Sequence, residues 1–178
     1  MPTARRLQRS TDDVHVGKAA ISMRRSTSFS DSRTLLWMYP LSYLAHIAEE
    51  YWAAGGYPAY LNQVLGVHLS PGRFLALQSA GLVLMCLGIM LARWLGFPRQ
   101  MMVILASVVL TNALTHIIRS ILGARYEPGL VTSLLIWVPL GSITLFKLYR
   151  RMSAVRYFVG AALGILICVV VELITMFG

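Results

Sequence analysis

Charged residues are scarce in this chain of 178 residues. Asp, Glu, Lys and Arg together make up 13% of it, against about 25% in soluble globular domains. Hydrophobic residues reach 57%, which exceeds the roughly 45–50% that is usual in soluble domains. The length suits one domain. So strong a depletion of charge argues against a water-soluble fold and indicates a membrane protein.

Acidic residues are especially few, with 7 Asp and Glu against 16 Lys and Arg and a formal net charge of +9. A net charge of this sign can indicate binding to nucleic acid. Here the Lys and Arg residues fall in short clusters between apolar runs, which is typical of topology signals in membrane proteins rather than of a phosphate-binding face. We therefore expect the lipid bilayer as a partner and no nucleic acid.

Cysteines are few, and several common motifs are missing. The two cysteines, Cys86 and Cys168, both lie in apolar runs, where a disulfide is not expected. The sequence has no internal repeat, no nucleotide-binding loop and no low-complexity run. The first apolar run continues into His46 without a small-residue cleavage site, which argues against a secretory signal.

Long apolar runs separated by short polar connections make up most of the chain. Residues 1–33 are polar and basic without an apolar period, and we expect a disordered tail there. Residues 34–178 predict one all-α membrane domain of about five spans, because ~20 apolar residues can cross a hydrocarbon core of ~30 Å. Short connections predict antiparallel neighbours in a helix bundle. The predicted spans are residues 34–52, 74–95, 100–122, 130–148 and 157–177.

The first span is the weakest, and the segment after it is too short to cross a membrane. Pro40 predicts a kink or a frayed turn in the first span, and residues 54–58 break the helix. Residues 59–69 then predict a short helix at the membrane interface. Ser70 followed by Pro71 predicts the N-cap and first turn of the second span.

The basic residues predict the orientation of the bundle. With five spans, 13 of the 16 Lys and Arg residues fall on the side that carries the N-terminal tail. Positively charged segments are retained in the cytoplasm. We therefore expect an integral protein of the plasma (inner) membrane with its N-terminus in the cytoplasm.

The first span carries a histidine and two adjacent carboxylates at its far end. His46, Glu49 and Glu50 occupy positions i, i+3 and i+4, so they share one face of a helix. Ionisable groups at the edge of a membrane span are costly unless they have partners or a function. The polar residues of the other spans are candidates for such partners.

Other polar side chains fall at corresponding depths. Asn112 and His116 share a face in the far half of the third span, which runs in the same direction as the first, and Glu172 lies near the far end of the fifth. Five spans therefore bring all these groups to one leaflet. Arg119 and, in the next loop, Tyr126 are expected at the rim, where a lipid headgroup or another polar substrate could approach. Glu172 is a further candidate member of the site, or a partner of Arg119.

The residue types suggest a metal site. Imidazoles from two helices and a carboxylate form a common ligand set for zinc or non-haem iron. His46 and His116, with Glu49 or Glu50, are therefore candidate ligands. The other glutamate is then a natural base for a water molecule, and Asn112 is a candidate to orient that water or an oxyanion.

Three motifs in order resemble a known family. His46-Ile-Ala-Glu-Glu50 resembles the motif that names the HXXEE family of multi-pass membrane proteins, and Asn112-Ala-Leu-Thr-His116 and Tyr126-Glu-Pro-Gly129 resemble its other two motifs. The resemblance covers roughly residues 35–175. It implies a polytopic membrane protein of unknown function in which enzymatic activity is suspected. A looser resemblance is to CAAX-type intramembrane proteases, which carry an Arg four residues after the second Glu, where this chain has Ala54.

Several functions fit this pattern. The first is a metal-dependent hydrolase or lipid-modifying enzyme whose site opens to one leaflet, with a lipid or membrane-embedded substrate. The second is a small proton-coupled transporter, in which histidines and carboxylates relay protons. The third is a non-catalytic scaffold whose polar cluster is structural, and a bis-histidine haem site through His46 and His116 is a fourth. The four tryptophans are assigned by default to lipid-facing or belt positions: Trp37, Trp52, Trp94 and Trp137.

Overall fold

The structure is a computed structural model that describes residues 35–177. The tail predicted over residues 1–33 lies outside the described residues. Within the described range every regular element is helical, which confirms the all-α prediction. The elements in chain order are a helix over residues 35–52 (the 35–52 helix), η1 (Ala53–Gly55), α2 (Tyr57–Leu65), α3 (Pro71–Trp94), α4 (Pro98–Leu122), α5 (Leu130–Thr132), the π-helical segment η2 (Ser133–Trp137), α6 (Val138–Tyr149) and α7 (Ala154–Phe177).

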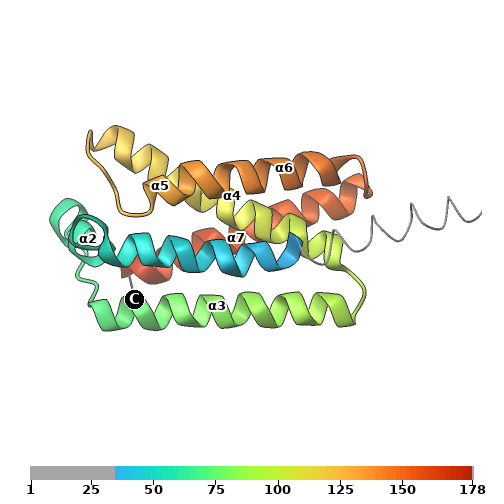
Figure 1. The fold of residues 1–178 in the computed structure, drawn as a ribbon, viewed down its shortest axis with the longest axis horizontal. Helices are drawn as coiled ribbons and strands as arrows, with labels where there is room; N and C mark the ends of the chain where they lie inside the picture. Colours follow the sequence, from blue (N-terminus) through green and yellow to red (C-terminus); the bar gives the residue numbers. More distant parts are fainter. Residues whose placement is uncertain (1–34, 178) are drawn as a thin grey trace, which may run out of the picture. The chain divides into compact units, whose positions relative to one another are not determined.

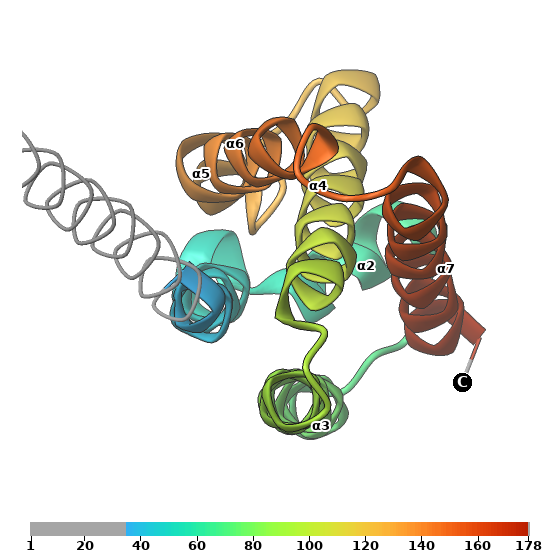
Figure 2. The same cartoon turned by 90° about the vertical axis from the view of Figure 1, so that its right-hand side faces the viewer.

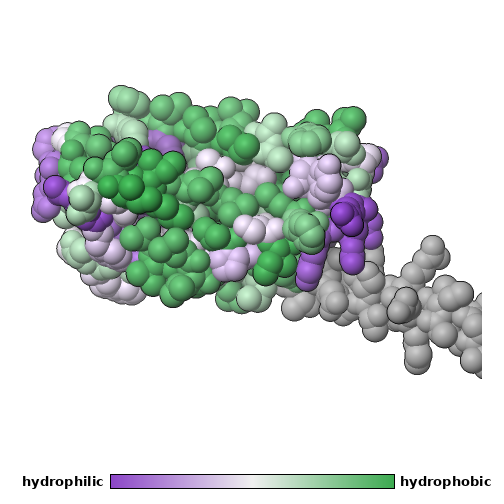
Figure 3. Space-filling model, turned by 90° about the horizontal axis from the view of Figure 1, so that it is seen from above, coloured by the Kyte–Doolittle hydropathy of each residue, from purple (hydrophilic) through white to green (hydrophobic). Residues whose placement is uncertain are grey.

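Four stretches among the described residues are long and apolar enough to cross a membrane: α3, α4, α7 and the continuous run from α5 through α6. On the face that Figure 3 shows, hydrophobic side chains cover most of the middle of the bundle, and the most hydrophilic ones gather toward its ends. These features confirm the predicted polytopic membrane bundle. The 35–52 helix is more polar and runs beside the four, where Tyr39 donates a hydrogen bond to Thr144 of α6 at 2.9 Å.

Several boundaries follow from the local sequence. The side chain of Ser70 accepts a hydrogen bond from the backbone N–H of Arg73, and Pro71 begins α3, as expected for an N-cap followed by proline. The short helix predicted over residues 59–69 is α2, which begins at Tyr57 and ends at Leu65, with Gly66 as its C-cap. The 35–52 helix passes through Pro40 without interruption, so the predicted fraying is not seen.

Successive spans alternate in direction (Figure 1). The 35–52 helix, α4 and α7 run one way, and α3 and the α5–α6 run the other way. The helix α4 lies in the middle and packs against α3, α6 and α7 (Figure 2). The approach of α7 to α4 requires Gly164, because a Cβ atom there would collide with the carbonyl oxygen of Ile104. The far ends of the 35–52 helix, α4 and α7 therefore converge at the end of the bundle that carries α2.

Candidate metal centre

Three buried side chains from two helices meet near the α2 end of the bundle. His46 and Glu50 come from the 35–52 helix, and His116 comes from α4. Oε1 of Glu50 lies 3.6 Å from Nε2 of His46 and 3.4 Å from Nε2 of His116. One candidate ligand atom from each residue lies within 4.8 Å of the other two. The structure therefore brings the two histidines together with one of the two adjacent glutamates.

The outer contact of His46 determines which of its nitrogens carries a proton. Nδ1 of His46 lies 2.7 Å from Oγ1 of Thr132, and that hydroxyl donates to Oε2 of Glu49 at 2.5 Å. A hydroxyl whose proton points to a carboxylate offers only lone pairs to the imidazole, so Nδ1 is the donor. The lone pair of neutral His46 is then on Nε2, which faces Glu50. Outer hydrogen bonds of this kind fix the orientation of metal-binding histidines.

Glu49 holds the start of α5 rather than facing the imidazoles. Its carboxylate accepts the backbone N–H groups of Val131 and Thr132 at 2.8 and 2.7 Å, and the hydroxyl of Tyr126 at 2.6 Å. Negative charge is favourable at a helix N-terminus. Partial burial and the hydrogen bond to Glu49 raise the pKa of Tyr126 above its ordinary value, so the phenol stays a donor. The structure thus differs from the expectation that Glu49 is a ligand or a base, because hydrogen-bond donors already surround its oxygens and Glu50 stands beside the imidazoles.

Glu127 stands behind His116 and is fully buried. Its Oε1 lies 3.2 Å from Nδ1 of His116 and 3.5 Å from Nη1 of Arg119. These are ion-pair distances without the alignment of a hydrogen bond. Arg119 also donates to the hydroxyl of Tyr57 at 2.7 Å and to Glu172 at 2.8 Å, so the expected pairing of Arg119 with Glu172 is present. With Nδ1 directed at a carboxylate, His116 presents Nε2 to Glu50.

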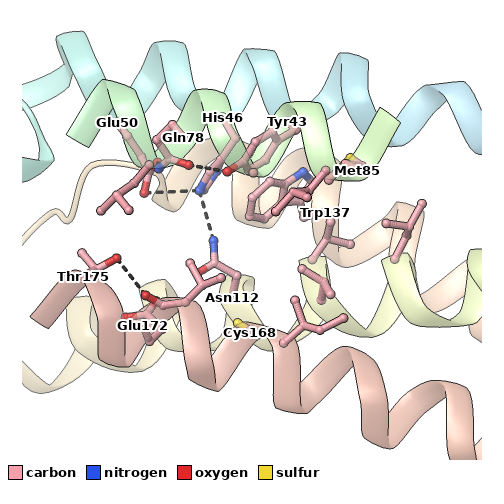
Figure 4. A pocket seen from close by; sticks show the side chains of 18 of the residues that line it. Tyr43, His46, Glu50, Gln78, Met85, Asn112, Trp137, Cys168, Glu172 and Thr175 are labelled. Atoms are coloured by element: carbon pink, nitrogen blue, oxygen red, sulfur yellow. Dashed lines mark hydrogen bonds and ion pairs between the residues drawn. The ribbon is translucent and has the colours of Figure 1, made fainter. Parts of the chain in front are cut away.

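Glu50 is held by an amide on α3. Gln78 donates from Nε2 to Oε2 of Glu50 at 2.6 Å, and the hydroxyl of Tyr43 donates to the amide oxygen of Gln78. The other oxygen of Glu50 is left to face the two imidazoles. Asn112 lies next to this group, with its amide nitrogen 3.4 Å from Nε2 of His46 (Figure 4). All three candidate ligands therefore have an outer partner on the side away from their meeting point.

Comparison with known families matches residues 37–144 to the family described as a protein of unknown function with HXXEE motif. The chain belongs to the HXXEE family. The match spans the three motifs and ends before α7, so it is shorter than the predicted range to about residue 175 and leaves Glu172 outside. No curated protein and no solved structure matches the chain. Membership confirms the resemblance. Because the family's function is unknown, the chemistry of the site has to be inferred from its geometry.

The Pro-Gly pair that follows Glu127 packs the loop of this HXXEE protein onto its two histidines. Gly129 adopts a φ of +101°, and a Cβ atom built there would lie 2.7 Å from Cε1 of His116 and 2.9 Å from Cε1 of His46. No residue with a side chain fits this position without displacing a ring. The third motif therefore contacts residues of the first two through its backbone at Gly129, in addition to the side-chain contacts of Tyr126 and Glu127.

Trp137 stacks on the histidine of the HXXEE motif. Its ring centroid lies 3.6 Å from that of His46, with 27° between the planes. The side chain is only 1% exposed, so its default assignment to a lipid-facing or belt position is wrong. The cause is the π-helical segment η2, whose i→i+5 bonding brings Thr132 and Trp137, five residues apart, onto the same imidazole.

A cavity of about 350 Å³ lies beside the ligand group. His46, Glu50, Asn112 and Glu172 line it, and Figure 4 shows Glu172 on α7 across from Glu50. Tyr126 is partly exposed at the surface, as expected for the rim. Arg119 lies deeper than expected, inside a network of ion pairs.

Four residues of the site were missed at the sequence level: Gln78, Glu127, Thr132 and Trp137. Glu127 carried a signal, since it is an acid inside the Tyr126–Gly129 motif. Thr132 and Trp137 act through η2, and a π-helical segment has no reliable local signature. Gln78 was an isolated polar residue in an apolar span, which is itself a sign of a buried partner.

Proposed function

We propose that this HXXEE protein is a divalent-metal-dependent membrane hydrolase or lipid-modifying enzyme, with His46, His116 and Glu50 as ligands. The observation that supports it most is that each of the three candidate ligands has a polar partner on the side away from the other two. Thr132 and Glu127 face the Nδ1 atoms of the two histidines, and Gln78 holds the second oxygen of Glu50. Outer partners of this kind are typical of metal sites.

Two of the distances between candidate ligand atoms fit a bound metal ion. Ligands at ~2.0–2.2 Å from a tetrahedral zinc ion lie roughly 3.3–3.6 Å apart. The Glu50 oxygen lies 3.6 and 3.4 Å from the Nε2 atoms of His46 and His116. Two histidines and one carboxylate form the ligand set both of some catalytic zinc sites and of non-haem iron sites, so the proposal covers zinc and iron.

The charge of the network supports a cation at the same place. Glu50 and Glu127 are buried beside the two histidines. Arg119 pairs with Glu127 and also with Glu172. Buried carboxylates in a membrane protein need compensating charge. A divalent metal supplies that charge while both imidazoles stay neutral.

The roles of the remaining residues follow from their positions. A divalent metal ion, when bound, acts as a Lewis acid and lowers the pKa of water. Asn112 is placed to orient a water molecule or a developing oxyanion. Because Glu49 is engaged at α5, the role of base falls to Glu172, the other carboxylate that lines the cavity. Arg119 and Glu127 hold Glu172 and His116 in place, and Tyr126 lies at the rim.

The same contacts favour a proton-coupled carrier as the second candidate function. Glu49, Thr132, His46, Glu50 and His116 form a chain of neighbouring polar atoms that leads from the half-exposed Glu49 into the bundle. Chains of histidines and carboxylates relay protons in membrane transporters. A haem site is less favoured, because Oε1 of Glu50 lies only 3.6 and 3.4 Å from the two Nε2 atoms that would bind the iron.

We further propose that the N-terminus is cytoplasmic and that the host membrane is the plasma (inner) membrane. Lys147, Arg150, Arg151 and Arg156 cluster at the end of the bundle opposite α2. Basic clusters remain in the cytoplasm. The three ligands would then face the non-cytoplasmic leaflet.

Elemental analysis of the purified chain tests the proposed function. We expect about one zinc or iron per chain, lost in His46→Ala and in His116→Ala and retained in His68→Ala, an exposed control histidine. Hydrolysis of carboxylic ester lipids should follow the metal content across the four proteins. A chain that folds, relays protons and carries no metal would favour the carrier. Absence of metal together with lower melting temperatures in both site variants would indicate a structural network.

A further inference from the structure

The cavity beside the ligands changes from polar to apolar along the bundle. Its polar lining residues gather toward the α2 end and include Glu50, Gln78, Asn112 and Glu172. Toward the middle of the bundle the lining is hydrocarbon and thioether, contributed by Leu84, Met85, Met101, Ile104, Leu105 and Val108. Figure 4 shows this order, with Glu50 and Thr175 toward one side and Met85 toward the other. The cavity therefore has a polar head and an apolar tail.

The length of the cavity corresponds to about half of a bilayer. On α3 the lining residues extend from Phe74 to Met85, which is about 16 Å at 1.5 Å per residue. Half of a hydrocarbon core of ~30 Å is about 15 Å. A lipid chain anchored at one leaflet and pointing to the midplane has the same length and the same change in polarity. The volume of about 350 Å³ suits a small ligand rather than a two-chain lipid.

The wall on the α3 side is open to the surrounding hydrocarbon. Leu84 lines the cavity and is nevertheless 68% exposed. The helix α3 packs against α4 and, through Gln78, against the 35–52 helix, and neither contact covers the exposed side of Leu84. A hydrocarbon chain can therefore reach the cavity sideways, from within the bilayer.

The head of the cavity disfavours anionic groups. Glu50 and Glu172 are the charged residues that line it, and Arg119, which pairs with Glu172, is not among the lining residues. While no metal ion is bound to Glu50, a phosphate or a free carboxylate would meet like charge there. An uncharged carbonyl group can accept a hydrogen bond from Asn112 without that repulsion.

We propose that this cavity binds the single hydrocarbon chain of a neutral acyl ester, with its carbonyl group beside Asn112 and its tail toward Met101. The identification of this ligand as a substrate rests on the proposed function. Hydrolysis consumes one water, whose oxygen bonds to the carbonyl carbon as the bond to the alcohol oxygen breaks. One water proton passes to the departing alcohol, and the acid that forms releases the other.

Quenching of tryptophan fluorescence by bromine tests the proposal with the full chain. Trp137 lines the cavity and is 1% exposed, whereas Trp37, Trp52 and Trp94 are exposed and are changed to Phe. The probe is methyl oleate brominated across its double bond, titrated into protein in detergent micelles. We expect saturable quenching of Trp137 and, after chelation of any bound metal ion, about tenfold weaker binding for brominated oleic acid at neutral pH.

Cavity-filling variants decide whether the quenching comes from this site. Val108→Phe and Cys168→Phe each place a ring in the cavity and should weaken binding of the ester about tenfold or more. Val83→Phe, on the exposed side of α3, is the matched control and should bind as the parent does. Quenching that rises linearly without saturation, or equally in every folded variant, would overturn the proposal.

The test separates binding of the hydrocarbon chain in the cavity from the metal chemistry. Saturable quenching that survives chelation, in a protein without metal or esterase activity, would support the site for the hydrocarbon chain and contradict the proposed hydrolase. The opposite result is a metal-loaded protein whose Trp137 shows no saturable quenching by the ester. It would contradict the site for the hydrocarbon chain and support the metal centre.

Discussion

Gly129 and His116 are in a contact that leaves no room for a methyl group: a Cβ atom at Gly129 would lie 2.7 Å from Cε1 of His116. This contact joins the loop motif to the histidine of α4. It explains why a glycine follows Pro128 in a loop that must close over two imidazoles, where the backbone also adopts a φ of +101°.

Gly129→Ala should therefore cost more than backbone strain alone. A left-handed conformation costs an L residue about 1–2 kcal/mol, and displacing the two imidazoles adds to that. Gly66→Ala is the control, because Gly66 has a φ of +67° with nothing within 4 Å of a Cβ atom. Thermal unfolding and metal content of both variants check this. Equal melting temperatures of the two variants, with metal retained in both, would show that the contact of Gly129 with the rings is unimportant.

Glu49→Gln and Glu50→Gln should separate a structural carboxylate from a ligand. Hydrogen bonds to charged groups contribute about 1.5–3 kcal/mol each, so Glu49→Gln should lower stability. Because Glu49 acts on His46 through Thr132, it should also weaken metal binding by about 10–100-fold. Glu50→Gln should abolish metal binding with a smaller change in stability. The reverse pattern in metal titrations would assign the ligand to Glu49.

Arg119→Leu should be strongly destabilising. It would leave the fully buried Glu127 beside His116 without its guanidinium partner, and breaking a buried ion pair costs about 3–5 kcal/mol. Arg125→Leu changes an exposed arginine in the following loop and should stay within about 0.5 kcal/mol of the parent. Chemical unfolding in detergent measures both, and similar stability of the two variants would contradict the network described for Arg119.

The amino-acid sequence predicted the parts of this protein that depend on periodicity and spacing. Long apolar runs predicted the spans, and the count of spans predicted that His46 and His116 face the same leaflet. The sequence could not separate Glu49 from Glu50, because neighbouring positions at i+3 and i+4 both face roughly toward His46. The start of α5 decides between them, because its backbone N–H groups donate hydrogen bonds to the carboxylate of Glu49. Trp137 was misassigned because a tryptophan in a membrane protein was placed by default at a lipid-facing or belt position. The π-helical turn that directs it inward appears only in three dimensions.

Cysteine labelling tests the topology that we propose from the basic clusters. In a Cys86→Ser/Cys168→Ser background, Arg125→Cys marks the loop before α5 and Ser153→Cys marks the loop before α7, both at exposed positions. These loops lie at opposite ends of the bundle. A membrane-impermeant maleimide applied to intact cells should label only Arg125→Cys. Labelling of Ser153→Cys alone would reverse the orientation, and labelling of both would contradict the arrangement of spans.

X-ray absorption spectroscopy at the metal edge tests the central claim most directly. The account predicts a zinc or iron ion whose spectrum shows scattering from two imidazoles, with nitrogen at ~2.0–2.1 Å for zinc. One imidazole should disappear in His46→Ala and one in His116→Ala, wherever residual metal remains, and the His68→Ala spectrum should equal that of the parent. A purified chain without a metal ion, or a spectrum that neither histidine variant alters, would contradict it.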